Sequence, residues 1–243
     1  CSVQTLDPCE GEECEALGYA ELPAIYGTDN RVEVANATTL QKSWAASVGH
    51  LVPTASVTCT GVECDVDLTA PMNSNRNIDV NGVAYPMCAD EAFSSQLRAG
   101  YCSAFLIGPD LLATAGHCFD DDATPGATTL EEARAACAQT NVVFGYDATT
   151  VDRAGQRAKI PRKDNYFCSA VVSVAFHGDE KLGGAFRSRD WAVFKLDRVV
   201  EGRAPLPIRR DGEVARREGL TVIGYPLGLP LKVAAGGSVR APS

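Results

Sequence analysis

Short apolar runs separated by turn residues dominate the chain from residue 101 onward. Residues 108–110 (Gly-Pro-Asp) predict a tight turn between the first two runs. One helix interrupts the series; Thr128 opens it, with Glu131 at capping-box spacing, and it runs towards residue 138. Mostly short strands with turns between them favour an all-β antiparallel sandwich or barrel. The runs with the length of strands are 101–107, 111–115, 142–146, 170–176, 191–196 and 220–225.

The first hundred residues carry weaker patterns. Residues 1–22 are acidic, have no clear apolar period, and are interpreted as a tether. Residues 23–97 are interpreted as an N-terminal extension with one helix and short strands between Pro-, Asn- and Asp-rich turns. The helix is predicted over 38–52, with Thr38 or Thr39 as its N-cap. Its apolar residues recur at helical spacing and are Leu40, Trp44, Val48 and Leu51.

Composition and charge narrow the class of protein. Apolar residues make up 45% of the 243 residues and charged residues 22%, which is enough apolar material for a core. The net charge of -9 argues against a nucleic-acid partner. No apolar run reaches the roughly 18 residues that a membrane span needs. The longest candidate, 103–118, is interrupted by Pro109, Asp110 and His117.

Ten cysteines are many for a reduced protein of this size. Their even number indicates disulfides and an oxidising, extracytoplasmic compartment. Two closely spaced pairs, Cys9 with Cys14 and Cys59 with Cys64, favour local disulfides. Zinc is the alternative, but only His117 of the three histidines lies beside a cysteine pair. We therefore expect no metal.

Cys1 is unusual as a first residue. Followed by an acidic, polar stretch, it resembles the start of mature bacterial lipoproteins, in which that cysteine carries the lipid. Such a lipid would tether the chain to a membrane surface. An arbitrary fragment boundary explains the first residue equally well, because no signal peptide is present in the sequence. The predicted location is secreted, periplasmic or lipid-anchored.

The stretch from Cys102 to Cys118 carries the strongest chemical signal. Two apolar strands joined by a tight turn form a hairpin, and a disulfide between Cys102 and Cys118 can fix its ends. His117 lies just inside that disulfide, and the small residues 114–116 let the backbone pack closely beneath its imidazole. A histidine held rigidly at a strand end is what a general base requires.

Residues 114–118 (Thr-Ala-Gly-His-Cys) resemble the histidine motif of chymotrypsin-like serine peptidases, and Cys102 stands where that family has its histidine-loop disulfide. Asp190 opens a nearly continuous apolar strand, with Ala192 two positions on, and resembles the aspartate motif of the same family. The order, histidine before aspartate, also matches. A strand-capping role is the alternative for Asp190.

Two weaker signals point to the glutamyl-endopeptidase branch of bacterial peptidases. Residues 220–230 are similar to the segment that enters the second barrel of those enzymes, and residues 26–31 loosely resemble their mature start. The resemblance implies a double antiparallel β-barrel, with the first barrel complete over 98–205 and the second barrel begun over 206–243. Within the first barrel, Cys137 and Cys168 are a plausible disulfide because both flank strands. Cys88 has no obvious partner other than Cys1.

The serine nucleophile of this family is missing from the sequence. The family uses a Gly-x-Ser-Gly turn, and this chain has no Ser-Gly dipeptide. Ser238 follows two glycines but precedes Val239, and we interpret it as the start of a strand with a structural role. The resemblance places the serine beyond residue 243, so this chain alone is expected to be inactive.

These observations predict a serine endopeptidase of the Ser-His-Asp type. Its substrate would be a polypeptide, His117 and Asp190 would be catalytic, and no cofactor is expected. A peptidase-like lipoprotein that lost its nucleophile and only binds a partner is the alternative.

Overall fold

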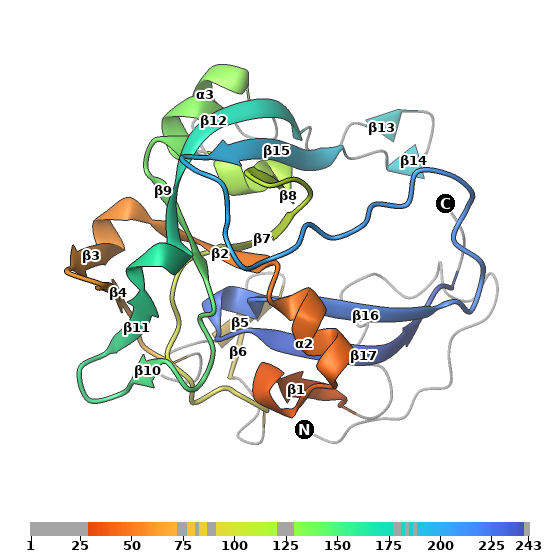
Figure 1. Ribbon diagram of the computed structural model, residues 1–243. Helices are drawn as coiled ribbons and strands as arrows, with labels where there is room; N and C mark the ends of the chain where they lie inside the picture. The colour runs from red at the N-terminus through yellow and green to blue at the C-terminus, as the bar shows by residue number, and fades with distance from the viewer. Residues whose placement is uncertain are drawn as a thin grey trace.

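A closed six-stranded barrel forms the centre of the molecule (Figure 1). The computed structural model describes residues 29–71, 91–120, 129–176 and 189–240, and the backbone of four short strands at 77–80, 83–86, 181–182 and 185–186. Every strand pair in the barrel is antiparallel, in the order β12-β15-β8-β7-β2-β9. The prediction of a mostly-β antiparallel barrel is therefore confirmed. The six strands are β2 (Val48–Pro53), β7 (Cys102–Leu106), β8 (Leu111–Thr114), β9 (Thr140–Phe144), β12 (Asn165–Phe176) and β15 (Asp190–Leu196).

Alternation along the strands fills the barrel interior. On β7, Cys102, Ala104 and Leu106 are buried, while Phe105 points outward and is exposed. A side chain from every second residue of a strand lies on the same face, so these three residues share one core. Phe119 and Phe194 pack edge to face there, with ring centroids 5.1 Å apart.

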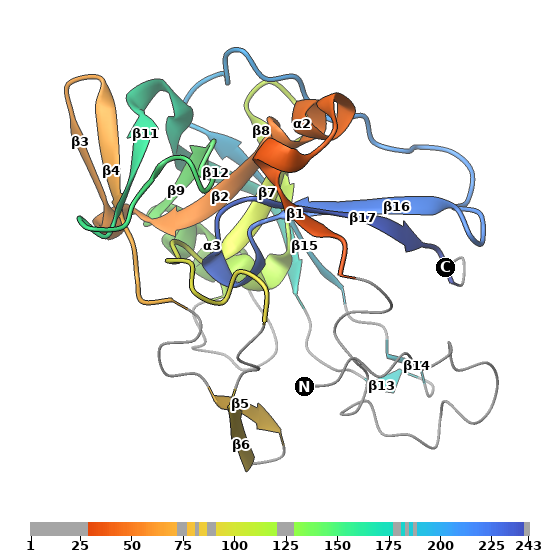
Figure 2. The same cartoon turned by 90° about the horizontal axis from the view of Figure 1, so that it is seen from below.

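Two further sheets lie on different sides of the barrel (Figure 2). The first has the order β10-β11-β4-β3, and Gly61 makes its hairpin turn with a φ of +60°. The second has the order β1-β17-β16. The strands of the two sheets are β3 (Val57–Thr60), β4 (Glu63–Asp67), β10 (Val151–Asp152), β11 (Arg157–Pro161), β1 (Arg31–Glu33), β16 (Gly219–Gly224) and β17 (Lys232–Ser238).

Short helices and hairpins complete the described structure. Two α-helices have capping boxes at their N-termini, which satisfy two backbone N–H groups each. Among the described residues, no helix has the length and apolarity that crossing a bilayer requires. The remaining elements are α2 (Thr39–Ala45), α3 (Leu130–Cys137), the 3-10 turns η2 (Val34–Asn36), η3 (Thr54–Ser56), η5 (Gly116–Phe119), η6 (Arg162–Asp164) and η7 (Pro226–Gly228), and the strands β5 (Asn77–Val80), β6 (Val83–Pro86), β13 (Lys181–Leu182) and β14 (Ala185–Phe186).

The predicted helix over 38–52 is wrong beyond Ala45. Thr38 caps it as expected, but Val48–Pro53 forms β2 and pairs with both β7 and β9. β-branched residues and Gly49 weaken a helix, and pairing on two sides favours the strand. The sequence predicts an N-terminal extension over 23–97, which includes the residues of β2, and a first barrel that begins only at residue 98. The structure instead places β2 inside the barrel.

Two smaller details of the sequence interpretation also change. Thr129, not Thr128, caps α3, and Glu132 completes its capping box. Residues 128–132 read Thr-Thr-Leu-Glu-Glu, so each threonine has a glutamate three positions later. The capping-box pattern therefore fits both threonines and does not decide between them. Ser238 is the last residue of β17 rather than the start of a strand, because β17 follows the register of β16 back from Lys232.

Candidate active site

Antiparallel pairing of β8 and β15 brings the two expected site residues together. Thr114, near the end of β8, lies opposite Ala192, near the start of β15. The chain continues from Thr114 into the 3-10 turn η5, which carries His117. Asp190 is the first residue of β15, two positions before Ala192. Residues 73 positions apart in sequence therefore meet at one rim of the barrel.

Both oxygens of the Asp190 carboxylate accept hydrogen bonds from His117. The backbone N–H of His117 donates to Oδ1 at 2.9 Å, and Nδ1 of the ring lies 2.7 Å from Oδ2. Partial burial of the carboxylate acts to raise its pKa. Hydrogen bonds from the backbone and ring of His117, and from the backbone of Gly116, act in the opposite direction and hold the pKa of Asp190 below its ordinary value.

The charge on Asp190 fixes the tautomer of the histidine. An ionised carboxylate can only accept hydrogen bonds, so Nδ1 of His117 must carry the proton. In the neutral ring, Nε2 is then left with a lone pair. The side chain of His117 is 53% exposed, so the site is open to a reacting group. This arrangement can remove a proton from such a group through Nε2.

Three local features hold the imidazole in place. A disulfide joins Cys102 on β7 to Cys118 on η5, so His117 is fixed to the barrel on its C-terminal side. The hydroxyl of Thr114 donates to the carbonyl of Ser103 at 2.8 Å, which ties β8 to β7. Gly116 packs so closely on β12 that a Cβ atom there would lie 2.4 Å from the carbonyl oxygen of Ala175. A larger residue would push η5 away from β12.

The ring of His117 also rests against an aromatic neighbour. Phe176, the last residue of β12, meets it edge to face, with ring centroids 6.1 Å apart. Within the described residues, the ring of His117 hydrogen-bonds to Asp190, and the backbone carbonyl of His117 accepts from the N–H of Asp120 at 3.1 Å. Ser238 pairs through its backbone with Gly219 in the β16–β17 sheet.

The cysteines next to His117 test the alternative that this chain binds zinc. Ligand-type atoms of Cys102, His117 and Cys118 all lie within 4.8 Å of one another. A zinc ligand must be a thiolate, and here the two sulfurs are joined as a disulfide. In this oxidised state only the imidazole remains as a ligand, so the residues do not fit a zinc site.

The remaining cysteines divide into two groups. Disulfides join Cys59 to Cys64 and Cys137 to Cys168, both pairs that the sequence suggests. Four other cysteines and one of the three histidines of the sequence lie outside the described residues; they are Cys1, Cys9, Cys14, Cys88 and His177.

Sequence reasoning did not anticipate the role of the backbone at this site. The N–H groups of His117 and Gly116 orient Asp190, and no residue type signals such contacts. It also missed His50, which lies on β2 and is fully buried in a second core. The helical interpretation of residues 38–52 concealed that strand.

Comparison with protein families agrees with the fold. Residues 102–243 match the model of the trypsin-like peptidase domain, a span of more than half of the chain that includes His117 and Asp190. The chain therefore belongs to the trypsin-like peptidase domain family. No curated protein matches the sequence.

Proposed function

We propose that this chain carries the histidine and aspartate of a serine endopeptidase, and that its nucleophilic serine lies outside residues 1–243. The observation that carries the proposal is the contact of 2.7 Å between Nδ1 of His117 and Oδ2 of Asp190, with the histidine side chain half exposed. Because the chain belongs to a peptidase family, we infer that its substrates are polypeptides.

The mechanism follows from the tautomer that Asp190 fixes. The serine oxygen attacks the carbonyl carbon of the peptide bond, and Nε2 of His117 takes the serine proton. Asp190 stabilises the imidazolium that forms and keeps its ring oriented. The same proton then passes to the leaving amine as the C–N bond breaks, which leaves an ester between serine and substrate. Water, activated by the same imidazole, hydrolyses that ester.

Two observations support a nucleophile from elsewhere. Residues 1–243 contain no Ser-Gly dipeptide, so the family's Gly-x-Ser-Gly turn is not among them. In the described chain, β16 pairs only with β17, and one edge of that sheet is open for further strands. The segment around β16 also carries the resemblance to glutamyl endopeptidases, which we retain as a proposed branch without a proposed specificity.

The disulfides support an extracytoplasmic location. Three of them occur in the described residues, and such bonds persist in oxidising compartments. An anchor through Cys1 would be consistent with that location.

Labelling with a fluorophosphonate tests the proposal. This reagent forms a P–O bond with an activated serine and releases fluoride, so it marks the nucleophile directly. The full gene product should be labelled before or after limited proteolysis, on a serine outside residues 1–243, and the His117→Ala variant should not. Labelling of Ser238, or cleavage by the 243-residue chain above that of its His117→Ala variant, would overturn our placement of the serine. A folded full-length protein that is never labelled would instead favour the binding protein.

A further inference from the structure

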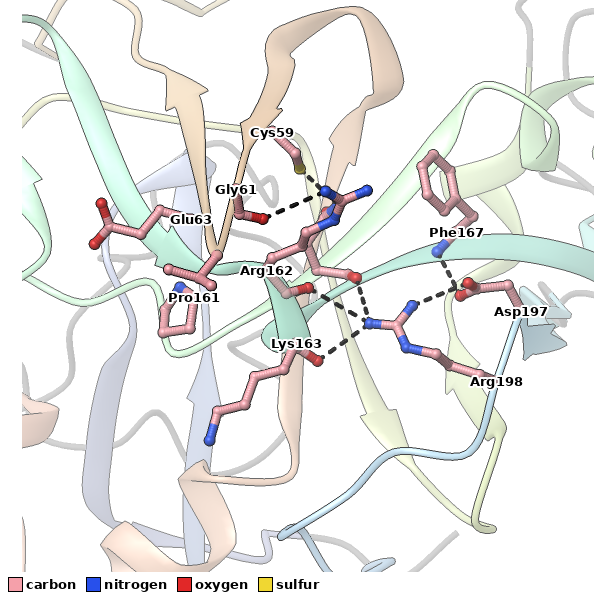
Figure 3. Close-up of a pocket in the computed structure, with 11 residues that line it drawn as sticks. Cys59, Gly61, Glu63, Pro161, Arg162, Lys163, Phe167, Asp197 and Arg198 are labelled. Atoms are coloured by element: carbon pink, nitrogen blue, oxygen red, sulfur yellow. Dashed lines mark hydrogen bonds and ion pairs between the residues drawn. The ribbon is translucent and has the colours of Figure 1, made fainter.

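A pocket lies at the end of β15 that is farther from His117, and Figure 3 shows its lining residues. Its volume is about 840 Å³, and it lies between the β3–β4 turn, η6, the start of β12 and the residues after β15. Asp190 opens the seven-residue strand β15, and Asp197 in the pocket follows its last residue. At about 3.3 Å per residue, the two aspartates are roughly 23 Å apart, so the pocket is separate from the candidate active site.

One wall of the pocket is the β3–β4 hairpin. The disulfide between Cys59 and Cys64 closes this hairpin, and β4 pairs along its length with β11. Two hydrogen bonds from Arg162 fasten the hairpin turn to η6. Its backbone N–H donates to the carbonyl of Val62 at 2.8 Å, and Nη1 donates to the carbonyl of Gly61 at 3.3 Å. The wall is therefore held in place without a ligand.

The facing wall is fixed by Arg198. Its guanidinium stacks over the ring of Tyr166 at 3.9 Å and donates to the carbonyl of Asn165 at 2.8 Å. It also donates to Oδ2 of Asp197 at 2.9 Å, while Oδ1 of Asp197 accepts from the backbone N–H of Phe167 at 2.9 Å. Both oxygens of Asp197 are thus engaged, and its charge is balanced by its neighbour.

The charges that remain in the pocket are mainly positive. Arg162 and Lys163 have no carboxylate within ion-pair distance among the described residues. Glu63 is the acidic residue of the lining without a basic partner, and its carboxylate extends away from Arg198 and Asp197 (Figure 3). The pocket therefore presents a net positive charge on a chain whose net charge is -9.

Apolar side chains lie beside these charges. Val62 at the hairpin turn is 83% exposed, and Phe167 on β12 is 47% exposed. Exposed apolar side chains next to unpaired basic groups suit a ligand that carries both a carboxylate and an apolar group. An acidic polypeptide segment with interspersed apolar residues has that chemistry.

We propose that this pocket is an accessory binding site for an acidic, partly apolar segment of the polypeptide substrate. A carboxylate of that segment binds Arg162 and Lys163, and a neighbouring apolar side chain contacts Val62 and Phe167. The assignment of the segment to a substrate rests on the proposed peptidase function. A polypeptide that reaches both sites must span about 23 Å, which is at least about seven extended residues, so short peptides do not use the pocket.

Direct binding tests the pocket without any need for catalysis. The probe is a fluorescein-labelled peptide of about twelve alternating Glu and Leu residues, and the readout is fluorescence anisotropy with the 243-residue chain. The same peptide with Gln in place of Glu should bind about tenfold more weakly, because it loses charge-assisted hydrogen bonds. Equal binding of the two peptides would overturn the proposal.

Variants of the chain locate the contact. Arg162→Gln with Lys163→Gln should weaken binding of the Glu peptide by at least about fivefold. Lys163→Gln alone covers the case in which loss of Arg162 disturbs the hairpin, since no hydrogen bond or ion pair of the Lys163 side chain is present in the described structure. The matched control, Lys42→Gln with Arg210→Gln, removes the same charge from exposed positions outside the pocket and should change binding by less than about twofold. Similar losses in both double variants would overturn the assignment.

Two further results separate the sources of failure. No peptide binding by a full gene product that reacts with fluorophosphonate would overturn the accessory site and leave the peptidase proposal intact. Peptide binding by a folded full gene product that never reacts would leave the pocket intact and overturn the peptidase proposal. Deletion of the acidic residues 1–22 should leave binding unchanged; binding about tenfold tighter after the deletion would assign the pocket to that segment and overturn the substrate assignment.

Discussion

His50 and His117 lie in regions of the molecule that differ in solvent exposure and in the hydrogen-bond partners of the ring. His50, on β2, is fully buried beside the rings of Tyr146 and Tyr225, whose centroids are 5.5 and 4.3 Å from its own. Neither of its ring nitrogens has a hydrogen-bond partner in the described structure. His117, at the barrel rim, is half exposed and paired with Asp190.

The difference shows that environment, not residue type, decides which histidine can act as a base. Burial disfavours the charged form of His50 and lowers its pKa to about 3, so it remains a neutral aromatic ring in the core. Gly100 confirms how tightly that ring is packed, because a Cβ atom there would lie 2.6 Å from its Nε2. His117 instead lies beside the carboxylate of Asp190 and is open to solvent.

Among the predicted changes, removing the negative charge of Asp190 beside His117 should have the largest effect, and that effect is on catalysis. Asp190→Asn leaves an amide that can stabilise the wrong tautomer, and we expect kcat/KM of the active peptidase to fall about 10⁴-fold. Thermal unfolding should shift little, because the site is at the rim. Asp211→Asn, an exposed control, should retain wild-type kcat/KM. A loss of less than about tenfold in Asp190→Asn would contradict the role of Asp190.

The buried histidine should affect stability rather than catalysis. Its pKa is about 3 when folded and near 6.5 when unfolded, so the unfolded chain binds an extra proton between those values. The stabilisation is complete above pH 6.5 and is lost as the pH falls, by about 3 kcal/mol between pH 6.5 and pH 4. Urea unfolding at several pH values measures it.

Two variants sharpen this second expectation. His50→Phe keeps a flat ring in the stack and should remove that part of the pH dependence. If the larger ring disturbs packing, His50→Leu gives the same comparison of slopes. His117→Ala should retain the wild-type pH dependence of stability, and equal slopes in wild type and both His50 variants would refute the interpretation.

A smaller effect is expected at the helix that supports the rim. α3 shares the barrel core with η5 through Ala133 and Cys137, and Thr129 caps it. Thr129→Ala should therefore lower the free energy of unfolding by about 1 kcal/mol, measured by urea denaturation. The same change at Thr128, which the sequence favours as the cap, should cost less than about 0.3 kcal/mol. Equal losses would show that the cap is shared.

The sequence predicts five strands of the barrel better than β2, the sixth strand, which closes it. Runs such as 191–196 are short and bounded by turn residues, so their length identifies them. β2 is buried at five successive positions from Val48 to Val52, and a strand buried on both faces loses the alternation that marks strands. The chance spacing of Leu40, Trp44 and Val48 then favours a helix. Only pairing with β7 and β9 resolves the choice.

The candidate active site and the proposed accessory pocket differ in the same way. His117 was found because its neighbours 114–118 form a local motif, and Asp190 because a carboxylate opens an apolar strand. The accessory pocket draws Val62, Arg162 and Asp197 from three distant segments, and none of these residues lies in a motif. Such a site exists only once the sheets are assembled, so a single sequence contains no local signal for it.

The register between β8 and β15 has a consequence for how this protein can diverge. Neighbouring strands of one barrel bring His117 and Asp190 side by side. The polypeptide between them contributes β9 and β12 to the same barrel, but the loops that join these elements do not set the register of β8 with β15. Insertions or deletions in the connecting loops should be well tolerated, whereas a one-residue slip between those two strands would turn the aspartate to the opposite face. Homologues are therefore expected to vary in the length of those loops while keeping β8 and β15 unbroken.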